Sequence, residues 1–576
     1  MPASPTPEWI VQDPDAATLA RLAELPACRD LAPLVQRLLC LRGYTEPDAV
    51  VRFLSPKLRD LSDPFLLPDM DKAVARLLKA IDAREKIVLY GDYDVDGVTS
   101  LTLMKTILGA YGADAATFLP HRTEEGYGIS EDGLDRCLEE HRPDLLVAVD
   151  CGTSSALQIA RLRGLGVDAV ILDHHECPAD EVPDCAALVN PKLCENGRRF
   201  DYFCSAGVVF KVGHALLKTR PLPAFDLRDF LDIAALGTLA DIVPLVDENR
   251  LLVRRGLIQL DRTLNPGLRE LKRVASVGSP CLPSDVGFRL GPRLNASGRI
   301  DTAQSSLDLP LSTDEQSARL LAEGLDAQNR ERQAIERQTF KEAQELLAES
   351  FDPQRDFCIV LGSENWHPGV VGIVASRMMR AYHRPAFIVA IGEDGIGKGS
   401  GRSVEGVSLV EAIAHCRPFL VNGGGHDMAA GITIAKERIP EFRQALGTCV
   451  MRSMNGGGIH SLRPKLVIDT VAELRELSLD LLDSYEQLQP FGCANPEPLF
   501  MARGLAPAAE PEVMKERHLK LRLYQGGQTR DAIFFGGAID PLPRPPWDVA
   551  FHISRNTFRG RQSLQITVQG IRAACE

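Results

Sequence analysis

The sequence predicts an α/β protein: a parallel-sheet domain, a long connecting helix, a smaller α/β domain and a β-rich C-terminal region. Three observations predict it. Short apolar strands alternate with helical stretches between about residues 70 and 245. Residues 312–350 contain no Pro and a single Gly, as a long helix requires. In the tail, segments such as "HLKLRLY" alternate apolar and polar residues with the period of a half-buried strand.

The first domain is expected to carry strands that are apolar throughout. Strands of this kind, separated by helices, form a parallel sheet that is covered on both faces. The expected strands are 86–90, 116–120, 145–149, 169–172 and 187–190.

Composition shifts along the chain predict five segments. The expected boundaries are 1–60 for an N-terminal helical segment, 61–311 for the parallel-sheet domain, 312–350 for the connecting helix, 351–455 for the second α/β domain and 456–576 for the β-rich region. In the second α/β domain, strands are expected at 357–361 and 386–391. The glycine-rich stretches 397–403 and 422–431 are expected to be turns.

Composition restricts the class of protein. The 576 residues carry a formal charge of −13, which argues against a generic basic nucleic-acid binder but leaves room for a local basic groove. No apolar run approaches the roughly 18 residues of a membrane span, and the N-terminus lacks the order of a secretory signal. The 14 cysteines include no C-x-x-C pair, so we expect a reduced, cytoplasmic protein without membrane association.

Acidic residues and histidines follow three of the expected strands. Asp92, Asp94 and Asp96 come after the first, Asp150 after another, and Asp173, His174 and His175 after a third. Ligands of open parallel sheets bind beyond the carboxyl ends of the strands. Asp241, in "GTLADIVPL", can add a carboxylate to the same rim.

This set of side chains predicts a metal site. Carboxylates with one or two imidazoles suit Mn²⁺ or Mg²⁺, and so many acids suit a pair of ions, the arrangement used for displacement at phosphorus. A lone Asp after a strand is usually a helix cap or turn residue. Asp173 fits that role and is expected to orient His174. The combination of three such motifs in one α/β unit favours the metal site.

At this point the motifs resemble a known family. "GDYDVDGVTS", "VAVDCGTSS", "LDHH" and "GTLADIVPL" resemble, in order, the motifs of the DHH phosphoesterase superfamily. "GPRLNASGR", "WHPGVVGIVASR", "GKGSGRS", "NGGGHDMAAG" and "PFGCANPEPLF" resemble the RecJ family of single-strand-specific 5′→3′ DNA exonucleases. The resemblance implies a DHH catalytic domain, a DHHA1 domain and a C-terminal OB-fold that binds single strands.

The resemblance also implies roles for the acidic residues. It assigns two divalent cations, Mn²⁺ or Mg²⁺, to the metal ligands Asp94, Asp96, Asp150, His174 and Asp241. Asp150 is expected to bridge the ions and Asp92 to hold water. His175 is expected to donate a hydrogen bond to the scissile phosphate.

Further residues are expected to hold the DNA. A 5′-phosphate is best bound by Arg forks and small donors. The candidates are Arg122, Arg293, Arg299, Ser400 and Arg402, with the backbone of the glycines at 397, 399 and 401 as an anion nest. Tyr127 is a candidate stacking surface, His426 a strand contact, and Arg555, Phe558 and Arg559 part of an OB groove.

The expected function is hydrolysis of single-stranded DNA from its 5′ end to nucleoside 5′-monophosphates, in DNA repair and recombination. The expected partners are a single-stranded-DNA-binding protein and a helicase, and the chain is expected to be a monomer. Three alternatives stay open: a DHH phosphodiesterase for oligonucleotides or cyclic dinucleotides, a non-catalytic DHH replication scaffold and, more distantly, an inorganic pyrophosphatase. The β-rich tail counts against the first and third, and the complete set of acids counts against the scaffold.

Overall fold

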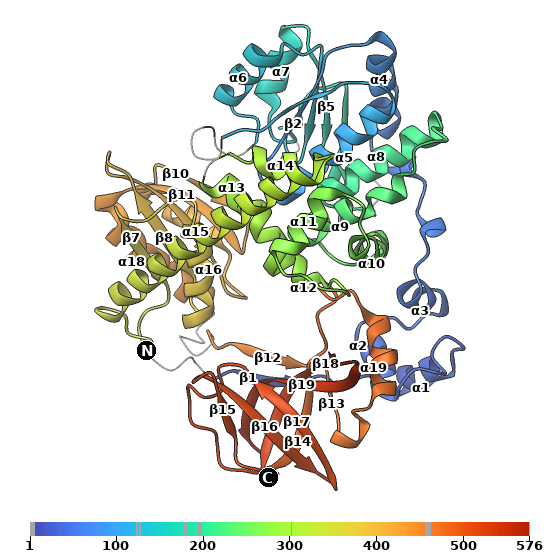
Figure 1. Cartoon of the computed structure of the whole chain (residues 1–576). Helices are drawn as coiled ribbons and strands as arrows, with labels where there is room; N and C mark the ends of the chain where they lie inside the picture. The colour runs from blue at the N-terminus through green and yellow to red at the C-terminus, as the bar shows by residue number, and fades with distance from the viewer. Residues whose placement is uncertain are drawn as a thin grey trace. The chain divides into compact units, whose positions relative to one another are not determined.

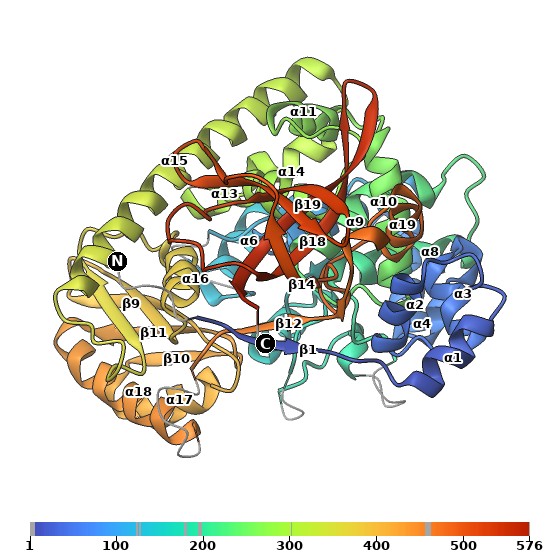
Figure 2. The same cartoon turned by 90° about the horizontal axis from the view of Figure 1, so that it is seen from below.

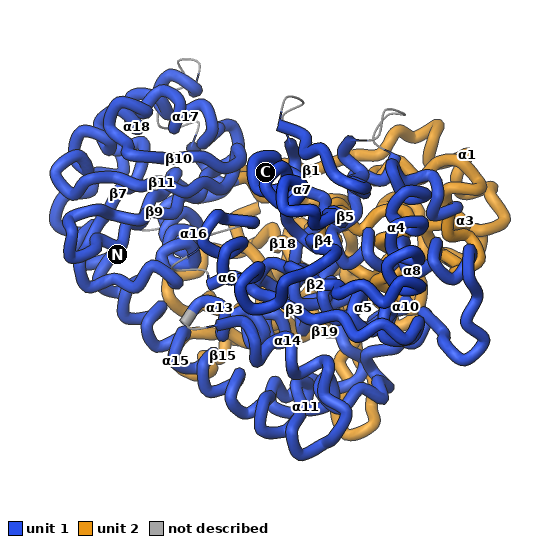
Figure 3. Tube along the Cα trace, turned by 90° about the horizontal axis from the view of Figure 1, so that it is seen from above, with its two compact units in different colours: residues 1–7, 63–243, 255–464 blue, residues 8–62, 244–254, 465–576 orange. Residues whose placement is uncertain are grey.

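The structure is a computed structural model that describes residues 6–121, 125, 128–177, 181–193, 199–300, 302–454 and 462–574. It divides into two compact units (Figure 3). Unit 1 comprises residues 1–7, 63–243 and 255–464, and unit 2 comprises residues 8–62, 244–254 and 465–576. Among the described residues, no helix combines the length and apolar character that crossing a membrane requires.

Unit 1 contains the expected parallel sheet. Its five strands have the order β3-β2-β4-β5-β6, and every neighbouring pair is parallel. The strands are β2 (Ile87–Gly91), β3 (Ala116–Phe118), β4 (Leu145–Val149), β5 (Asp168–Leu172) and β6 (Ala187–Val189). The chain adds β3 on one side of β2 and then β4 on the other. The strand order therefore reverses between β2 and β4, which is where ligands bind in open α/β sheets.

Helices cover both faces of this sheet (Figure 1). Residues of α6 (Glu131–His141) and α7 (Ala156–Gly164) share one buried apolar cluster with alternate residues of the strands. On the other face lie α4 (Met70–Ala83), α5 (Val95–Ala110) and α8 (Ser205–Thr219). Burial on both faces explains why the strands are apolar throughout.

Unit 1 continues through shorter helices into the long one. These are α9 (Leu231–Ala240), α11 (Pro266–Val274), α12 (Pro283–Asp285), α13 (Gly291–Ile300) and α14 (Gln304–Leu311). The π-helical segment Val286–Leu290 precedes α13, and α10 (Asp247–Asp261) follows α9. The expected connecting helix is α15 (Glu315–Ala348), which Asp314 caps by accepting a hydrogen bond from the Ser317 N–H at 2.8 Å.

A second sheet follows α15, in the order β10-β11-β9-β8-β7. Its strands are β7 (Ile359–Ser363), β8 (Ala386–Ile391), β9 (Ile396–Arg402), β10 (Asn422–Gly425) and β11 (Ala429–Ala435). Its helices are α16 (Val371–Tyr382), α17 (Leu409–Cys416) and α18 (Ile439–Ser453). The prediction that 397–403 and 422–431 are turns was wrong, because both glycine-rich stretches are mostly strand.

Unit 2 is a β-barrel with helices. The strands β14 (Phe500–Pro507), β18 (Trp547–Phe558), β19 (Arg561–Ala573), β17 (Gln528–Phe534) and β16 (His518–Gln525) pair in this order, and β14 also pairs with β16, which closes the ring. The edge strands are β13 (Thr470–Val471) and β15 (Glu512–Met514). Figure 2 shows β1 (Glu8–Val11) lying along β12 (Lys465–Ile468), a parallel pairing that the sequence did not suggest.

The helices of unit 2 share the core of the barrel. They are α1 (Ala16–Glu24), α2 (Pro33–Leu41), α3 (Pro47–Leu54) and α19 (Leu479–Tyr485). The buried guanidinium of Arg250 donates to the carbonyl oxygens of Phe53, at 2.9 Å, and Gln489, at 2.8 Å. This segment of α10 therefore packs as part of unit 2.

Candidate metal centre and phosphate site

The acidic loop after β2 is held closed by its own backbone. Asp94 caps α5, and its Oδ1 accepts hydrogen bonds from the N–H groups of Asp96 at 2.8 Å and Gly97 at 3.1 Å. A Cβ at Gly97 would lie 2.3 Å from the Asp92 carbonyl oxygen, so this close approach requires glycine. The carboxylates of Asp92, Asp94 and Asp96 are therefore held close together in one short loop.

Asp96 is anchored by the start of another helix. Its Oδ2 accepts from the Ser205 N–H at 2.7 Å, and its Oδ1 accepts from the Ala206 N–H at 2.9 Å. Both donors belong to the first turn of α8, where unpaired N–H groups and the helix dipole favour an anion. The orientation of this carboxylate is therefore set before any cation binds.

The predicted ligands from distant segments converge on His174. Its Nε2 lies 3.5 Å from Asp150 Oδ1, 3.5 Å from Asp241 Oδ2 and 3.9 Å from Asp96 Oδ2. Within the part of the chain that the structure describes, this buried nitrogen has no hydrogen-bond partner. A buried acceptor surrounded by carboxylates is costly unless a cation occupies the space between them.

Three groups of side chains have ligand atoms within 4.8 Å of one another. They are Asp96 with His174 and Asp241, Asp92 with Asp94 and Asp150, and Asp150 with His174 and His175. Asp150 and His174 each belong to two of these groups, and of the two only the carboxylate has two oxygens with which to bridge a pair of ions. Asp92 lies in one of these groups, and its expected water-holding role stays a prediction.

The protonation of the site reflects the crowding of like charges. Burial, together with the Asp94 charge, raises the pKa of Asp96 to about 6. Burial and the charges of Asp96 and Asp94 raise the pKa of Asp241 to about 8, and burial also holds the pKa of Asp150 well above its usual range. Burial lowers the pKa of His174 to about 3, so its imidazole is neutral and able to ligate.

Asp173 binds both histidines: it accepts a hydrogen bond from the backbone N–H of His174, the predicted partner, at 2.7 Å, and it orients the imidazole of His175. Its Oδ1 accepts from Nδ1 of His175 at 2.7 Å, and its Oδ2 accepts from the Thr153 N–H at 3.0 Å. Burial alone would raise the pKa of Asp173, but the hydrogen bond and charge of His175 bring it below its usual value. Burial opposes protonation of His175, yet the Asp173 hydrogen bond raises its pKa overall.

Asn190 completes this network and was missed from the sequence. Its Nδ2 donates to the His175 carbonyl oxygen at 2.9 Å and to Thr153 Oγ1 at 3.1 Å. The signal was present, because Asn190 directly follows β6 as the acids follow their strands. Four strand ends thus contribute to one site.

Two of the predicted phosphate ligands lie on one face of β9. A Cβ at Gly397 would lie 2.4 Å from a Val389 side-chain carbon, and one at Gly401 would lie 2.4 Å from the Phe387 ring. The alternate residues, Ser400 and Arg402, point to the opposite face. The predicted anion nest was wrong, because these glycines sit inside a sheet ladder and their absent side chains make room for β8.

The face with Ser400 and Arg402 meets the start of α16. A Cβ at Gly372 would lie 3.0 Å from Ser400 Oγ and 3.4 Å from Arg402 Nη2. The N-cap residue of α16 is Val370, whose apolar side chain makes no capping hydrogen bond. Arg402 Nη1 donates to Ser400 Oγ at 3.0 Å, which fixes the two side chains together. The Ser400 hydroxyl, the Arg402 guanidinium and the N-terminus of α16 together form a cluster of hydrogen-bond donors that can bind an anion.

Helix α13 connects this donor group to the acidic loop. At one position, a Cβ on Gly298 would lie 3.0 Å from the Tyr93 carbonyl oxygen, within the acidic motif. At the next, Arg299 donates through Nη1 to the Gly369 carbonyl oxygen at 3.2 Å, just before α16. Adjacent residues of α13 therefore lie against the acidic loop and against the segment before α16, all within unit 1.

The remaining described candidates differ in their surroundings. Arg293 is paired with Asp326 at 2.9 Å, and Arg555 is held by Glu486 at 2.7 Å. His426 is exposed in the turn between β10 and β11. Phe558 is 66% exposed in the β18–β19 hairpin, with the Arg559 guanidinium 5.2 Å from its ring. Arg122 and Tyr127 lie outside the described residues.

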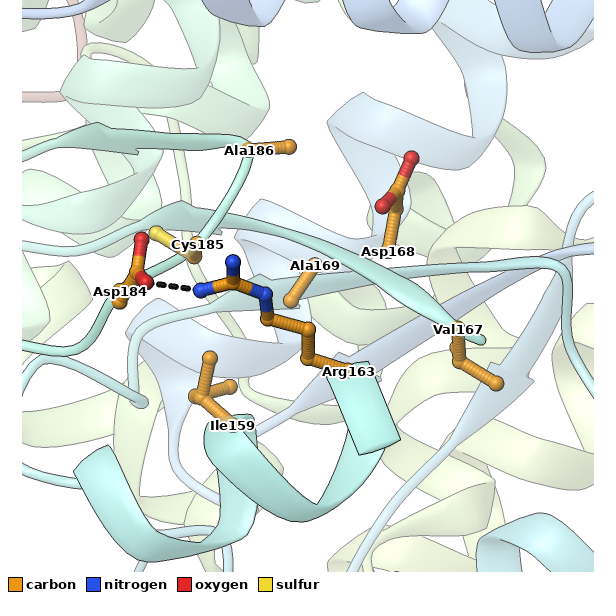
Figure 4. Close-up of a pocket in the computed structure, with 8 residues that line it drawn as sticks. All are labelled: Ile159, Arg163, Val167, Asp168, Ala169, Asp184, Cys185 and Ala186. Carbon is orange, nitrogen blue, oxygen red and sulfur yellow. Dashed lines mark hydrogen bonds and ion pairs between the residues drawn. The ribbon is translucent and has the colours of Figure 1, made fainter. Parts of the chain in front are cut away.

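A cavity of about 190 Å³ lies at the other end of β5 (Figure 4). Asp168 and Ala169, which begin the strand, line it, whereas His174 follows the end of the same strand. An ion pair between Arg163 and Asp184 crosses the lining. This cavity is separate from the acidic cluster.

The fold and the site define a DHH-family protein. Residues 86–238 match the DHH family, N-terminal domain, residues 355–452 match the DHHA1 domain, and residues 468–570 match the RecJ OB domain. These matches confirm the predicted fold class. The chain belongs to the RecJ family, because near full-length relatives exceed 30% identity.

Two such relatives are named single-stranded-DNA-specific exonuclease RecJ. The protein from Bacillus subtilis is 35% identical over 97% of this chain and 70% of its own length. The protein from Escherichia coli is 33% identical over 95% of this chain and 97% of its own length. The crystal structure of RecJ in complex with Mn²⁺ from Thermus thermophilus is similar with a TM-score of 0.84 and 29% identity, covering 99% of this chain and 80% of that one.

Proposed function

We propose that this protein is a metal-dependent exonuclease that degrades single-stranded DNA from its 5′ end and releases nucleoside 5′-monophosphates. The observation that carries the proposal is the convergence of Asp96, Asp150 and Asp241 on the buried Nε2 of His174. Membership of the RecJ family supports the substrate, and solved relatives carry Mn²⁺ and Mg²⁺.

Two divalent cations fit the residues present. Asp96, His174 and Asp241 would hold one ion, Asp92 and Asp94 the other, and Asp150 would bridge them. Bound ions of this kind lower the pKa of water and neutralise charge on phosphate oxygens. The protein fixes the ligands in advance, through the first turn of α8 at Asp96 and the cap of α5 at Asp94.

His175 is proposed to stabilise the phosphate during the reaction. Its side chain is 32% exposed, compared with 9% for His174, so it is the imidazole that a substrate can reach. Asp173 binds its Nδ1 and raises its pKa, which favours the imidazolium form. An imidazolium Nε2–H can donate to the charge that develops on the phosphate oxygens.

The 5′ polarity rests on the donors at α16. Ser400, Arg402 and the first turn of α16 would hold a terminal phosphate, with Arg299 beside them. A terminal phosphate carries more charge than an internal one and gains more from such a group. Because α13 links these donors to the acidic loop, an anchored 5′ end would present its first internal phosphodiester to the metal centre.

The OB domain is proposed to bind the strand beyond the active site, with Phe558 and Arg559 as an exposed aromatic and basic pair. Arg555 is ion-paired with Glu486 and Asp483, so the proposed strand contact consists of Phe558 and Arg559. A DNA-repair role in the cytoplasm, a monomeric state, a single-stranded-DNA-binding protein and a helicase complete the proposal.

The test is an assay of labelled single strands with Mn²⁺. Release of mononucleotides from 5′-labelled strands, loss of activity with a chelator, and loss of activity in His174→Ala are expected. Asp232→Asn is the control, because Asp232 is a buried polar residue like His174 but binds Thr263, at 2.6 Å, outside the acidic cluster. Release from the 3′ end would overturn the polarity, and equal attack on duplex would overturn the strand preference.

A further inference from the structure

Ile242 has a backbone conformation that its residue type disfavours. It follows Asp241, the C-cap residue of α9, and its φ is +59°. Helices commonly end on a residue in this left-handed region, and that residue is usually glycine or asparagine. For a β-branched residue the conformation is a genuine outlier, since the branched Cβ crowds the backbone.

The same side chain is also 71% exposed. An isoleucine on the surface leaves apolar area in water, and an isoleucine with positive φ strains the backbone. Neighbouring apolar residues of α9, such as Ala235 and Leu236, are buried. Ile242 therefore combines two costs without the burial that would offset them inside the protein.

Its position is fixed against the metal centre. Asp241 donates its N–H to the Gly237 carbonyl oxygen at 3.0 Å, and its Oδ2 lies 3.5 Å from His174 Nε2. A Cβ at Gly237 would lie 2.7 Å from Asp96 Oδ1, so α9 ends pressed against the acidic loop. Adjacent Cα atoms are about 3.8 Å apart, which places Ile242 beside the proposed ligands.

We propose that Ile242 is a substrate-contacting residue whose side chain packs on the base of the nucleotide next to the scissile phosphate. This inference rests on the proposed nuclease function. A single strand exposes the faces of its bases, and an apolar side chain packs on any of them without reading their edges. Such a contact suits an enzyme that must advance along every sequence. Strained residues that persist beside a reactive centre commonly serve it.

The test compares Ile242→Gly with wild-type enzyme on two 5′-phosphorylated single strands. One strand is ordinary, and the other carries an abasic residue on each side of the first scissile phosphate. Arg142→Gly is the matched control, because Arg142 also has a positive φ, of 48°, at the end of a helix, α6, that carries none of the proposed ligands. Initial rates give kcat and KM, and thermal melts of the metal-loaded enzymes give Tm.

Ile242→Gly is expected to lose about tenfold in kcat/KM on the ordinary strand, the size of one apolar contact, and to equal wild type on the abasic strand. Its Tm is expected to be unchanged or higher, because glycine relieves the strain. Arg142→Gly should match wild type on both strands. Equal losses on both strands, no loss on either, or a lowered Tm would overturn the inference. If wild-type enzyme releases nothing from the ordinary strand, the proposed function itself fails.

Discussion

Replacing Asp150 by Asn is expected to stabilise the metal-free protein while abolishing its activity. Asp150 is 2% exposed and close to several other carboxylates, and burial with their charges raises its pKa well above the usual value. The folded protein therefore takes up a proton that the unfolded chain releases. Asparagine keeps the shape of the side chain but needs no proton.

The magnitude follows from proton linkage. A folded-state pKa above the unfolded value means that the folded state binds more protons, so stability falls as pH rises from about 4 towards the folded pKa. Each pH unit in that interval costs about 1.4 kcal/mol per carboxylate. Asp241 of the same cluster, whose pKa is raised to about 8, gives the scale, which is about 4 kcal/mol at pH 7. Proton sharing among the acids and screening reduce it to about 2 kcal/mol, so we expect a Tm about 3 °C higher in the variant.

The assay is thermal melting between pH 5 and 8, with a chelator or with saturating Mn²⁺. Wild-type Tm with chelator should fall across this range, because Asp96 and Asp241, with pKa values of about 6 and 8, are forced to ionise. Mn²⁺ held at one concentration, 100 times its Kd at pH 7, should stabilise the wild type by about 2.7 kcal/mol for each bound ion at that pH, and by more at pH 8 than at pH 5. Asp150→Asn should lose most of this gain.

The control is Asp232→Asn, which replaces a buried carboxylate with a raised pKa outside the cluster. It should keep both the Mn²⁺ gain and the nuclease activity. A lower Tm for metal-free Asp150→Asn, or an undiminished Mn²⁺ gain, would refute the electrostatic account of the site.

Three further predictions follow from individual contacts. Asp173→Asn should lower kcat by about 10²–10⁴ while Mn²⁺ affinity is retained, because it releases the imidazole that Asp173 orients; electron paramagnetic resonance of bound Mn²⁺ checks the second part. Ser400→Ala and Arg402→Ala should each raise KM for 5′-phosphorylated strands by about 10-fold or more, and leave 5′-hydroxyl strands nearly unchanged; equal effects on both strands would contradict the phosphate site. Gly401→Val should lower the free energy of unfolding by about 1–3 kcal/mol or more, because its Cβ would lie 2.4 Å from an aromatic ring of β8. Gly424→Ala is the control and should lower it by less than about 0.5 kcal/mol, because none of the described atoms beyond its own neighbours lies within 4 Å of the added Cβ. Urea unfolding measures both free energies.

The sequence was sufficient where one local rule decides the structure. Apolar strands between helices gave the parallel sheet, and the expected strand 145–149 coincides with β4 (Leu145–Val149). Carboxyl ends of parallel strands share one rim, so Asp92, Asp150 and His174 could be grouped without coordinates. The helix-forming composition of 312–350 likewise gave α15.

The sequence misled where glycine had two readings. In "GKGSGRS" the glycines suggested a turn with an anion nest. In the structure they lie on the face of β9 that packs against the side chains of Phe387 and Val389, where a Cβ would not fit. Glycine is depleted in strands and common in turns, so local propensity favoured the turn. Packing from β8 overrode that propensity, and the partner strand is not visible within the motif.

The sequence also could not predict which charged side chains pair with each other. Arg293 and Arg402 both stand in glycine-containing motifs, yet Arg293 is neutralised by Asp326 on α15, while Arg402 lies with Ser400 at the start of α16. Asp173 accepts hydrogen bonds from the backbone N–H of His174 and from the ring of His175, and the sequence does not show which of the two imidazoles reaches the carboxylate.

The sequence alone determined which segments become strands and helices, and that acids and imidazoles end several strands, because these properties depend on composition and short-range periodicity. Tertiary structure decided which oxygens approach His174, which carboxylate pairs with Arg293, and that Ile242 stands strained and exposed beside the site. Those outcomes depend on contacts between residues far apart in the chain, and the spacing of residues along the sequence carries no measure of such distances.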